Sequence, residues 1–232
     1  MLYIIGLGLN VDGISKYGLA VAKKCKKVYL ENYTVEFPYS KKELEDVIKK
    51  KIISANREFI ESLKIIDEAK KTDVALLVYG SPLTATTHIS LIQEANKSGV
   101  KHKTIYNASV FDAVAETGLQ IYKFGKIASM PEFEADSFMK VVKENQSINA
   151  HSLILVDIGL GFERALEKLE KAARKYEVKL NKVVICSKLG TSQSRIYHNN
   201  IKNFKDKKIK APYCIILPGK LHFIEKEVLD EF

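Results

Sequence analysis

Apolar and polar positions along the chain change their spacing in a way that marks out its elements. Residues 74–79 form an unbroken apolar run, typical of a strand buried on both faces of a parallel sheet. Gly80 and Pro82 end this run, and residues 84–97 show helical spacing. The pattern therefore predicts a strand, a tight turn and a helix. The turn is either an ordinary connection or part of a ligand-binding crevice, where free N–H groups at the helix start would favour a carboxylate or another acceptor. These residues alone favour the ordinary connection.

The first half of the chain repeats this alternation of strand and helix. Ser15 is placed to cap a first helix, and Gly99 is placed to end the helix at residues 84–97. Alternating strands and helices indicate an α/β fold with a mostly parallel sheet covered by helices. The further expected strands lie at residues 2–5, 28–30 and 103–106, and the further expected helices at 15–26, 41–50, 56–70 and 110–117.

The pattern changes near the middle of the chain. Gly125 and Pro131 bracket a stretch without strong helical periodicity, so we place a domain boundary here, with domains at residues 1–117 and 118–232. In the second domain we expect strands at 151–158, 183–187 and 214–217, a strand or mixed segment at 194–204, and helices at 163–176 and 221–232. The chain is therefore predicted to form two α/β domains.

Composition places the chain among globular proteins. It has 232 residues, of which 46% are hydrophobic and 28% charged, enough to bury a sizeable core. The net charge of +9 would permit an anionic partner such as RNA. The lysines are spread over predicted helical faces, as at residues 41–42, 49–51 and 205–210, so we interpret them as a solvated surface, with RNA binding as the alternative.

The cysteines and the N-terminal sequence indicate in which cellular compartment the protein works. Cys25, Cys186 and Cys214 are odd in number, far apart and without a Cys-x-x-Cys pair, which argues against a disulfide framework or a zinc site. The N-terminus lacks the pattern of a signal peptide, and no apolar run approaches the ~20 residues of a membrane-spanning helix. We expect a cytoplasmic protein.

Common catalytic motifs are absent. Gly6, Gly8 and Gly13 do not form the Gly-x-Gly-x-x-Gly dinucleotide fingerprint, and the five histidines show no metal-ligand spacing. Neither Ser81 nor Ser109 lies in a Gly-x-Ser-x-Gly elbow. We interpret His88 as a structural residue at a helix start rather than a general base, while Asp157 either faces a site or caps a turn. These residues alone predict a two-part α/β protein with a small-ligand cleft.

Four stretches together resemble the diphthine synthase family, within the tetrapyrrole-methylase-like superfamily of S-adenosylmethionine-dependent methyltransferases. They are residues 2–9 (Leu-Tyr-Ile-Ile-Gly-Leu-Gly-Leu), 80–88 (Gly-Ser-Pro-Leu-Thr-Ala-Thr-Thr-His), 118–126 (Gly-Leu-Gln-Ile-Tyr-Lys-Phe-Gly-Lys) and 218–222 (Pro-Gly-Lys-Leu-His). The family's central motif is Gly-Asp-Pro-Leu-Val-Ala-Thr-Thr-His, so Ser81 and Thr84 are departures. The region of residues 130–137 is also shorter than is usual in the family.

The resemblance implies two α/β domains, with mostly parallel and mixed sheets, and S-adenosylmethionine folded into the cleft between them. Carried over residue by residue, it places cofactor contacts at Leu9, Ser81, Thr84, Ser109, Val110, Val156, Leu189 and Tyr213. It also implies a homodimer. Because the sequence has no cluster of metal-ligating residues, we expect no metal.

The reaction that the resemblance implies is repeated methylation of an amine nitrogen. The substrate would be a histidine of translation elongation factor 2 that carries a 3-carboxy-3-aminopropyl group, and the product would be diphthine. The amine must be neutral to react, and alignment of the reactants can supply much of the catalysis; we name no general base. An RNA methyltransferase of the same superfamily and a non-catalytic cofactor-binding module are the alternative functions.

Overall fold

The computed structural model describes all 232 residues, and the chain divides into two compact units. Unit 1 comprises Met1–Asp112 and unit 2 comprises Ala113–Phe232. The division in the structure comes five residues before the boundary expected from the sequence, which follows Thr117. No helix is both long and apolar enough to cross a membrane.

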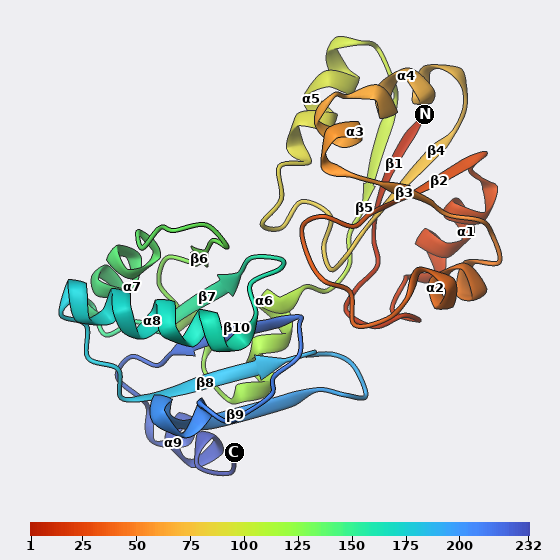
Figure 1. Cartoon of the computed structure of the whole chain (residues 1–232). Helices are drawn as coiled ribbons and strands as arrows, with labels where there is room; N and C mark the ends of the chain where they lie inside the picture. The colour runs from red at the N-terminus through yellow and green to blue at the C-terminus, as the bar shows by residue number, and fades with distance from the viewer. The chain divides into compact units, whose positions relative to one another are not determined.

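Unit 1 is a five-stranded sheet with helices on both faces (Figure 1). The strand order is β3-β2-β4-β1-β5, and every neighbouring pair is parallel. The strands are β1 (Leu2–Gly6), β2 (Lys27–Glu31), β3 (Ile53–Ala55), β4 (Val74–Val78) and β5 (His102–Ile105). The helices are α1 (Lys16–Lys24), α2 (Lys41–Ile48), α3 (Arg57–Glu61), α4 (Lys64–Lys71) and α5 (Ile89–Lys97). The predicted α/β fold with a parallel sheet is confirmed.

Burial in unit 1 follows from its sequence pattern. All five residues of β4 are buried, because the strand is central and covered on both faces. Helices α1 and α2 pack on one face of the sheet, and α3, α4 and α5 pack on the other (Figure 1). Ser15 caps α1 by accepting a hydrogen bond from the Gly18 amide at 3.0 Å, and Gly99 follows α5 with a positive φ of 64°. Both predicted helix ends are confirmed.

Two helices in unit 1 differ from their predicted extents. The helix expected at residues 56–70 is split into α3 and α4, because Leu63 has a φ of 61° that a continuous helix does not allow. The helix expected at 84–97 begins only at Ile89, since Ala85 has a φ of 55° and residues 81–88 form turns. The short strand β3 was not predicted, because three residues carry too little pattern.

Unit 2 is a mixed five-stranded sheet with strand order β6-β7-β10-β8-β9. β6 and β7 are parallel, whereas β10 is antiparallel to both β7 and β8, and β8 is antiparallel to β9. The strands are β6 (Ala128–Met130), β7 (Ser152–Val156), β8 (Lys182–Ser187), β9 (Arg195–Asn200) and β10 (Tyr213–Leu217). Helix α6 (Val110–Ala113) crosses from unit 1 into unit 2. The further helices of unit 2 are α7 (Phe138–Ser147), α8 (Phe162–Tyr176) and α9 (Phe223–Leu229), with 3-10 turns η1 (Val114–Thr117), η2 (Ile121–Lys123) and η3 (Ile201–Phe204).

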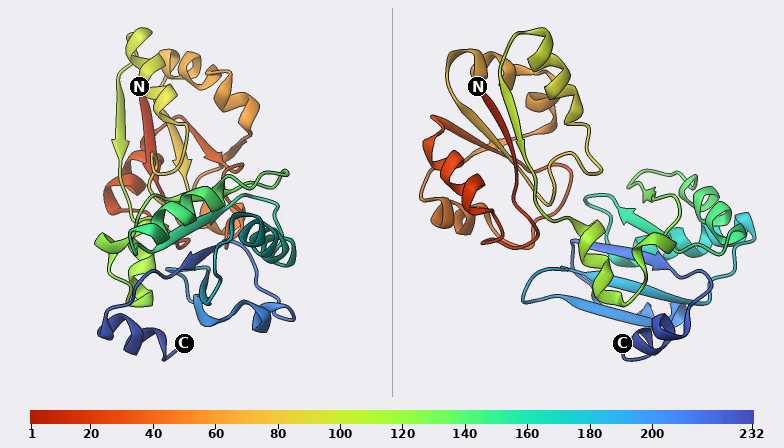
Figure 2. Two further views of the ribbon diagram at one scale, coloured as in Figure 1. Left: turned by 90° about the vertical axis from the view of Figure 1, so that its left-hand side faces the viewer. Right: turned by 180° about the vertical axis from the view of Figure 1, so that it is seen from behind.

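One face of the unit 2 sheet is covered by α7 and α8, which contact each other (Figure 2). The mixed segment expected at 194–204 is confirmed as β9 followed by η3. Strand β6 and helix α7 were not predicted: β6 is short, and only four of the ten residues of α7 are buried. The sheet also sets Cys186 on β8 directly opposite Cys214 on β10, with both thiols free and buried.

A buried carboxylate fixes the C-terminal helix of unit 2. Glu225 on α9 is fully buried and accepts hydrogen bonds from the Gln120 amide at 2.9 Å, the His222 amide at 2.7 Å and the Lys123 ammonium. His151 is also fully buried; its Nδ1 accepts from the Gly219 amide at 2.9 Å, so its Nε2 donates to Glu225 at 3.0 Å. Every polar group in this cluster therefore has a partner.

This cluster shifts the pKa values of its two titratable side chains. Burial alone would raise the pKa of Glu225, but the hydrogen bonds from Lys123, the two amides and His151 outweigh it and lower the pKa from 4.5 to about 2. Burial lowers the pKa of His151 below 6.5, although Glu225 opposes the shift. At neutral pH the cluster thus contains a charged carboxylate and a neutral imidazole.

Candidate functional site

The candidate residues of unit 1 follow three strands that are neighbours in its sheet. Leu9 comes after β1, Ser81 after β4 and Ser109 after β5, and these strands lie in the order β4-β1-β5. Because the strands are parallel, their carboxyl ends meet at one edge of the sheet. The structure therefore brings Leu9, Ser81, Thr84, Ser109 and Val110 to one edge, where ligands bind in folds of this class.

Glycines allow the loops at this edge to pack directly on one another. The amides and carbonyls of Gly8 and Gly80 form two reciprocal hydrogen bonds, of 3.2 and 3.0 Å. A Cβ atom on Gly6 would lie 2.6 Å from the Gly80 carbonyl oxygen and 3.0 Å from the Asn107 Cβ. Glycine is thus required at position 6 by close approach of three loops.

Two polar side chains hold the Leu9 loop in place. The Asn107 side-chain amide donates to the carbonyls of Gly6 at 3.1 Å and Gly13 at 2.9 Å. The Tyr79 hydroxyl donates to the Leu9 carbonyl at 3.2 Å, and burial raises the Tyr79 pKa so that the proton stays in place. Sequence reasoning missed both residues. Both residues lie within two positions of the carboxyl end of a strand, but that position does not show which loop each side chain holds.

The hydroxyl groups at this edge divide into two kinds. Ser109 is 7% exposed, and its Oγ is engaged with the Asp112 carboxylate at 3.1 Å and the Phe111 amide at 3.2 Å. The hydroxyls of Ser81 and Thr84, by contrast, make no hydrogen bond within the chain, and both residues are only half-buried. These two groups are available to a ligand without breaking any existing bond.

His88 occupies the start of α5, as predicted, and is fully buried. Its Nδ1 lies 3.2 Å from the Pro82 carbonyl oxygen, which also accepts from the Thr86 hydroxyl at 3.1 Å. Because α5 begins at Ile89, Ser81 does not lie at a helix N-terminus. The free amides at the start of α5 therefore follow Ser81 by eight residues and do not belong to the turn itself.

The three candidate residues of unit 2 also share an edge of their sheet. Val156 ends β7, Leu189 follows β8 and Tyr213 begins β10, which runs between those two strands in the opposite direction. Leu189 is 5% exposed, and the Tyr213 hydroxyl donates to the Leu160 carbonyl at 2.8 Å. This edge is mostly apolar, in contrast to the polar edge of unit 1.

Comparison with known proteins shows to which family the chain belongs. The family described as tetrapyrrole (corrin/porphyrin) methylases matches residues 1–205. A diphthine synthase of Methanococcus maripaludis is 35% identical, and the alignment covers 99% of this chain and 97% of that protein. The chain belongs to the diphthine synthase family. It is accordingly a methyltransferase of the tetrapyrrole methylase superfamily.

Two further relatives extend the comparison. A crystal structure of a diphthine synthase superposes with a TM-score of 0.92 at 33% identity, covering all of this chain and 95% of that one. Diphthine methyl ester synthase 2 of Candida albicans is 43% identical over 76% of this chain, but that alignment covers only 62% of the yeast protein. The predicted tetrapyrrole-methylase-like fold is confirmed.

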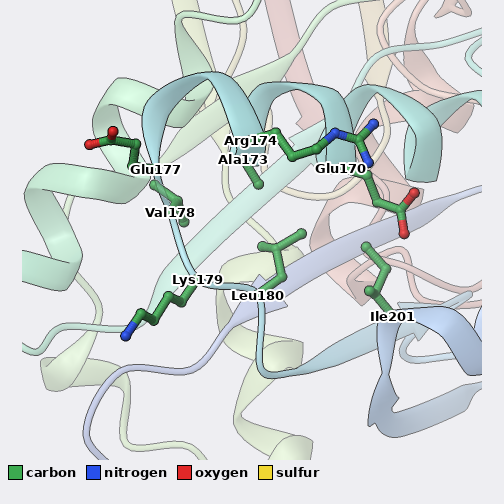
Figure 3. A pocket seen from close by; sticks show the side chains of 8 residues that line it. All are labelled: Glu170, Ala173, Arg174, Glu177, Val178, Lys179, Leu180 and Ile201. Carbon is green, nitrogen blue, oxygen red and sulfur yellow. The ribbon is translucent and has the colours of Figure 1, made fainter.

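Other features of this diphthine synthase family member involve none of the eight candidate residues. Asp157 caps a turn by accepting from the Ile158 amide at 3.1 Å. No three His, Cys, Asp or Glu side chains come together as metal ligands would. A groove of about 380 Å³ lies at the end of α8 and includes Glu170, Arg174 and Ile201, but none of the eight candidate residues lines it (Figure 3).

Proposed function

We propose that this chain is a diphthine synthase that uses S-adenosylmethionine to methylate an amine nitrogen. The observation that carries the proposal is the polar edge of unit 1, where the hydroxyls of Ser81 and Thr84 have no partner beside the packed glycine loops. The full-length similarity to diphthine synthases supports it. When bound, the cofactor supplies an electrophilic sulfonium methyl group.

The residues present fit a cofactor without phosphates. The backbone amides and carbonyls of Gly8 and Gly80 are paired with each other, so this contact offers no free amide for a phosphate. Leu9 and Val110 supply apolar surface, and Ser81 and Thr84 supply hydrogen-bonding groups. We propose these residues and Ser109 as cofactor contacts in unit 1, and Val156, Leu189 and Tyr213 as the contacts in unit 2.

For this reaction the protein mainly has to bind the cofactor and the substrate, orient them and remove water from the amine. An ammonium ion has no lone pair, so the substrate amine must be neutral when it reacts. An apolar surface such as that of Val156 and Leu189 would lower the pKa of an amine bound against it. Orientation of two bound reactants can contribute roughly 7–11 kcal/mol. No residue is proposed as a general base.

The proposed substrate is the 3-carboxy-3-aminopropyl histidine of translation elongation factor 2, and the proposed product is its trimethylated form, diphthine. The chain would work in the cytoplasm and as a homodimer. Light scattering at micromolar concentration checks the dimer, and a monomer would contradict it.

One experiment tests the function directly. The protein is incubated with methyl-labelled S-adenosylmethionine and elongation factor 2, with and without the 3-carboxy-3-aminopropyl group on its histidine. We expect label in the modified factor only, and mass spectrometry should show three added methyl groups. A fourth, base-labile methyl would instead indicate an ester, the product named for the Candida albicans relative.

RNA methylation remains the alternative that the +9 charge would suit. Label in ribosomal RNA and none in the factor would favour it, and binding should then weaken steeply as salt is raised. Binding of the cofactor with transfer to neither acceptor would favour a non-catalytic module.

A further inference from the structure

Two buried polar atoms without partners lie on facing aromatic rings in unit 1. His88 Nε2 and the Tyr33 hydroxyl are buried and make no hydrogen bond. The two rings meet edge to face, with centroids 6.4 Å apart and planes at 83°. Native proteins leave few buried polar atoms without partners, since each costs free energy. Two such atoms on rings that meet edge to face therefore call for a physical account.

The hydrogen-bonding roles of the two groups are complementary. The Pro82 carbonyl only accepts, so His88 Nδ1, at 3.2 Å from it, carries a proton, and in the neutral ring Nε2 holds the lone pair. Burial raises the Tyr33 pKa to about 12, so its hydroxyl keeps its proton and remains a donor. One ring thus offers an acceptor and the other a donor.

The two residues come from different loops at the carboxyl edge of the sheet. Tyr33 follows β2, and its loop is anchored by the fully buried Glu31 carboxylate, which accepts from the amides of Tyr33 at 2.7 Å and Thr34 at 2.8 Å. His88 belongs to the loop that carries Ser81 and Thr84. A link between the rings would tie the second loop to the anchored first one.

We propose that His88 is a positioning residue for the loop that carries Ser81 and Thr84. Its Nδ1–H holds the Pro82 carbonyl, and its Nε2 is joined to the Tyr33 hydroxyl through one buried water molecule. A water needs two or more polar partners, and these two atoms supply them. The proposal rests on the cofactor site proposed above, because it explains how that loop is held in its binding conformation.

Calorimetric titration with S-adenosylmethionine tests the role of His88. His88→Phe removes both ring nitrogens, and we expect about tenfold weaker binding, the equivalent of one lost hydrogen bond. His88→Asn keeps a donor near the Nδ1 position and should recover binding to within about threefold of wild type. In turnover, His88→Phe should raise KM for S-adenosylmethionine more than it lowers kcat. Unchanged binding by His88→Phe would overturn the positioning role.

Tyr33→Phe tests the link, since it removes one oxygen and keeps the ring. We expect it to weaken binding about threefold in the wild type and to have no effect in the His88→Asn background, because coupled residues are not additive. An equal effect in both backgrounds would overturn the link. His102→Asn and Tyr17→Phe are matched controls in the same unit and should bind as the wild type does.

A second readout does not depend on the cofactor. Nuclear magnetic resonance of the His88 ring nitrogens should show Nδ1 protonated and Nε2 bare, and Tyr33→Phe should shift the Nε2 signal. If the wild type fails to bind S-adenosylmethionine, the proposed function is wrong, but the resonance still tests the link between His88 and Tyr33. An Nε2 resonance that Tyr33→Phe leaves unchanged would overturn that link.

Discussion

The two units differ in whether their buried side-chain polar atoms have hydrogen-bond partners. In unit 1, three buried side-chain polar atoms have no partner: the hydroxyls of Tyr33 and Tyr39, and His88 Nε2. Unit 2 buries Glu225, His151 and other polar side chains, and every side-chain polar atom that it buries completely has a hydrogen bond. Unit 1 thus keeps hydrogen-bonding capacity at its strand ends for a ligand or water, whereas unit 2 uses that capacity to hold its own helix α9.

The buried cysteines allow the two units to be followed separately. Cys25 is 1% exposed in unit 1, and Cys186 and Cys214 are 1% and 3% exposed in unit 2. A thiol reagent reacts with such groups only when the surrounding structure opens, so labelling located by mass spectrometry reports the stability of each unit.

The largest expected effect comes from Glu225→Ala. Removing the carboxylate leaves His151, Lys123 and two amides without their acceptor, so we expect unit 2 to lose about 3–5 kcal/mol of unfolding free energy. Labelling of Cys186 and Cys214 across a urea series measures the loss. Glu227→Ala, an exposed residue of the same helix, is the control and should change stability by less than about 0.5 kcal/mol. Equal loss of protection at Cys25 would show that the units do not unfold independently.

Acid should weaken unit 2 through the same cluster. The pKa of Glu225 is about 2 in the folded protein and near 4.5 when unfolded, so its stabilisation is complete above pH 4.5 and is lost as the pH falls toward 2. The loss amounts to about 3 kcal/mol. Because the pKa of His151 is also lowered, a further decline begins below pH 6.5.

Urea unfolding at several pH values, read at Cys186 and Cys214, checks this acid response. Glu225→Ala should flatten the profile between pH 4.5 and 2, while Glu227→Ala should keep it. A variant without Glu225 that still loses the same stability in that window would assign the effect to other carboxylates.

Ligand binding should separate the contributions of the two units to the cofactor site. S-adenosylmethionine at about 100 times its Kd should stabilise a unit that holds it by about 2.7 kcal/mol, with S-adenosylhomocysteine acting likewise. We expect slower labelling at Cys25 and at Cys186, and no change when a chelator is added. Protection gained at Cys25 alone would remove Val156, Leu189 and Tyr213 from the site, and loss of protection with chelator would contradict a metal-free site.

The smallest expected effect concerns Ser81, where the family has Asp. A charge-assisted hydrogen bond contributes about 1.5–3 kcal/mol against about 1 kcal/mol for a neutral one. Ser81→Asp should therefore bind S-adenosylmethionine up to about tenfold more tightly, or equally well if Thr84 or a water already compensates. Calorimetry decides, with Thr87→Asp as a control for added charge in the same loop. Severalfold weaker binding with an intact fold would show that the loop differs from the family's arrangement.

The sequence predicted most of unit 1 because its central strands β1 and β4 are apolar runs and the segments between its strands show helical periodicity. The predicted helix boundaries were wrong where a single residue ends the helix. Leu63 and Ala85 adopt positive φ although neither is glycine, and no sequence pattern indicates this conformation. At the site, the edge positions of Ser81 and Ser109 followed from strand ends. The supporting roles of Tyr79 and Asn107 could not be predicted, because they depend on which loops pack together across about 70 and 94–101 residues of sequence.

The distance in sequence between Glu225 and its partners bears on how unit 2 folds during synthesis. Gln120, Lys123 and His151 are made 105, 102 and 74 residues before Glu225. Unit 1 contains all of its own strands within Met1–Asp112 and has what it needs to fold while translation continues. Unit 2 cannot complete its buried cluster until α9 has been synthesised. Until then the imidazole of His151 and the amide of Gln120 lack their acceptor, so a nascent unit 2 that stops short of α9 exposes polar groups that the folded unit buries.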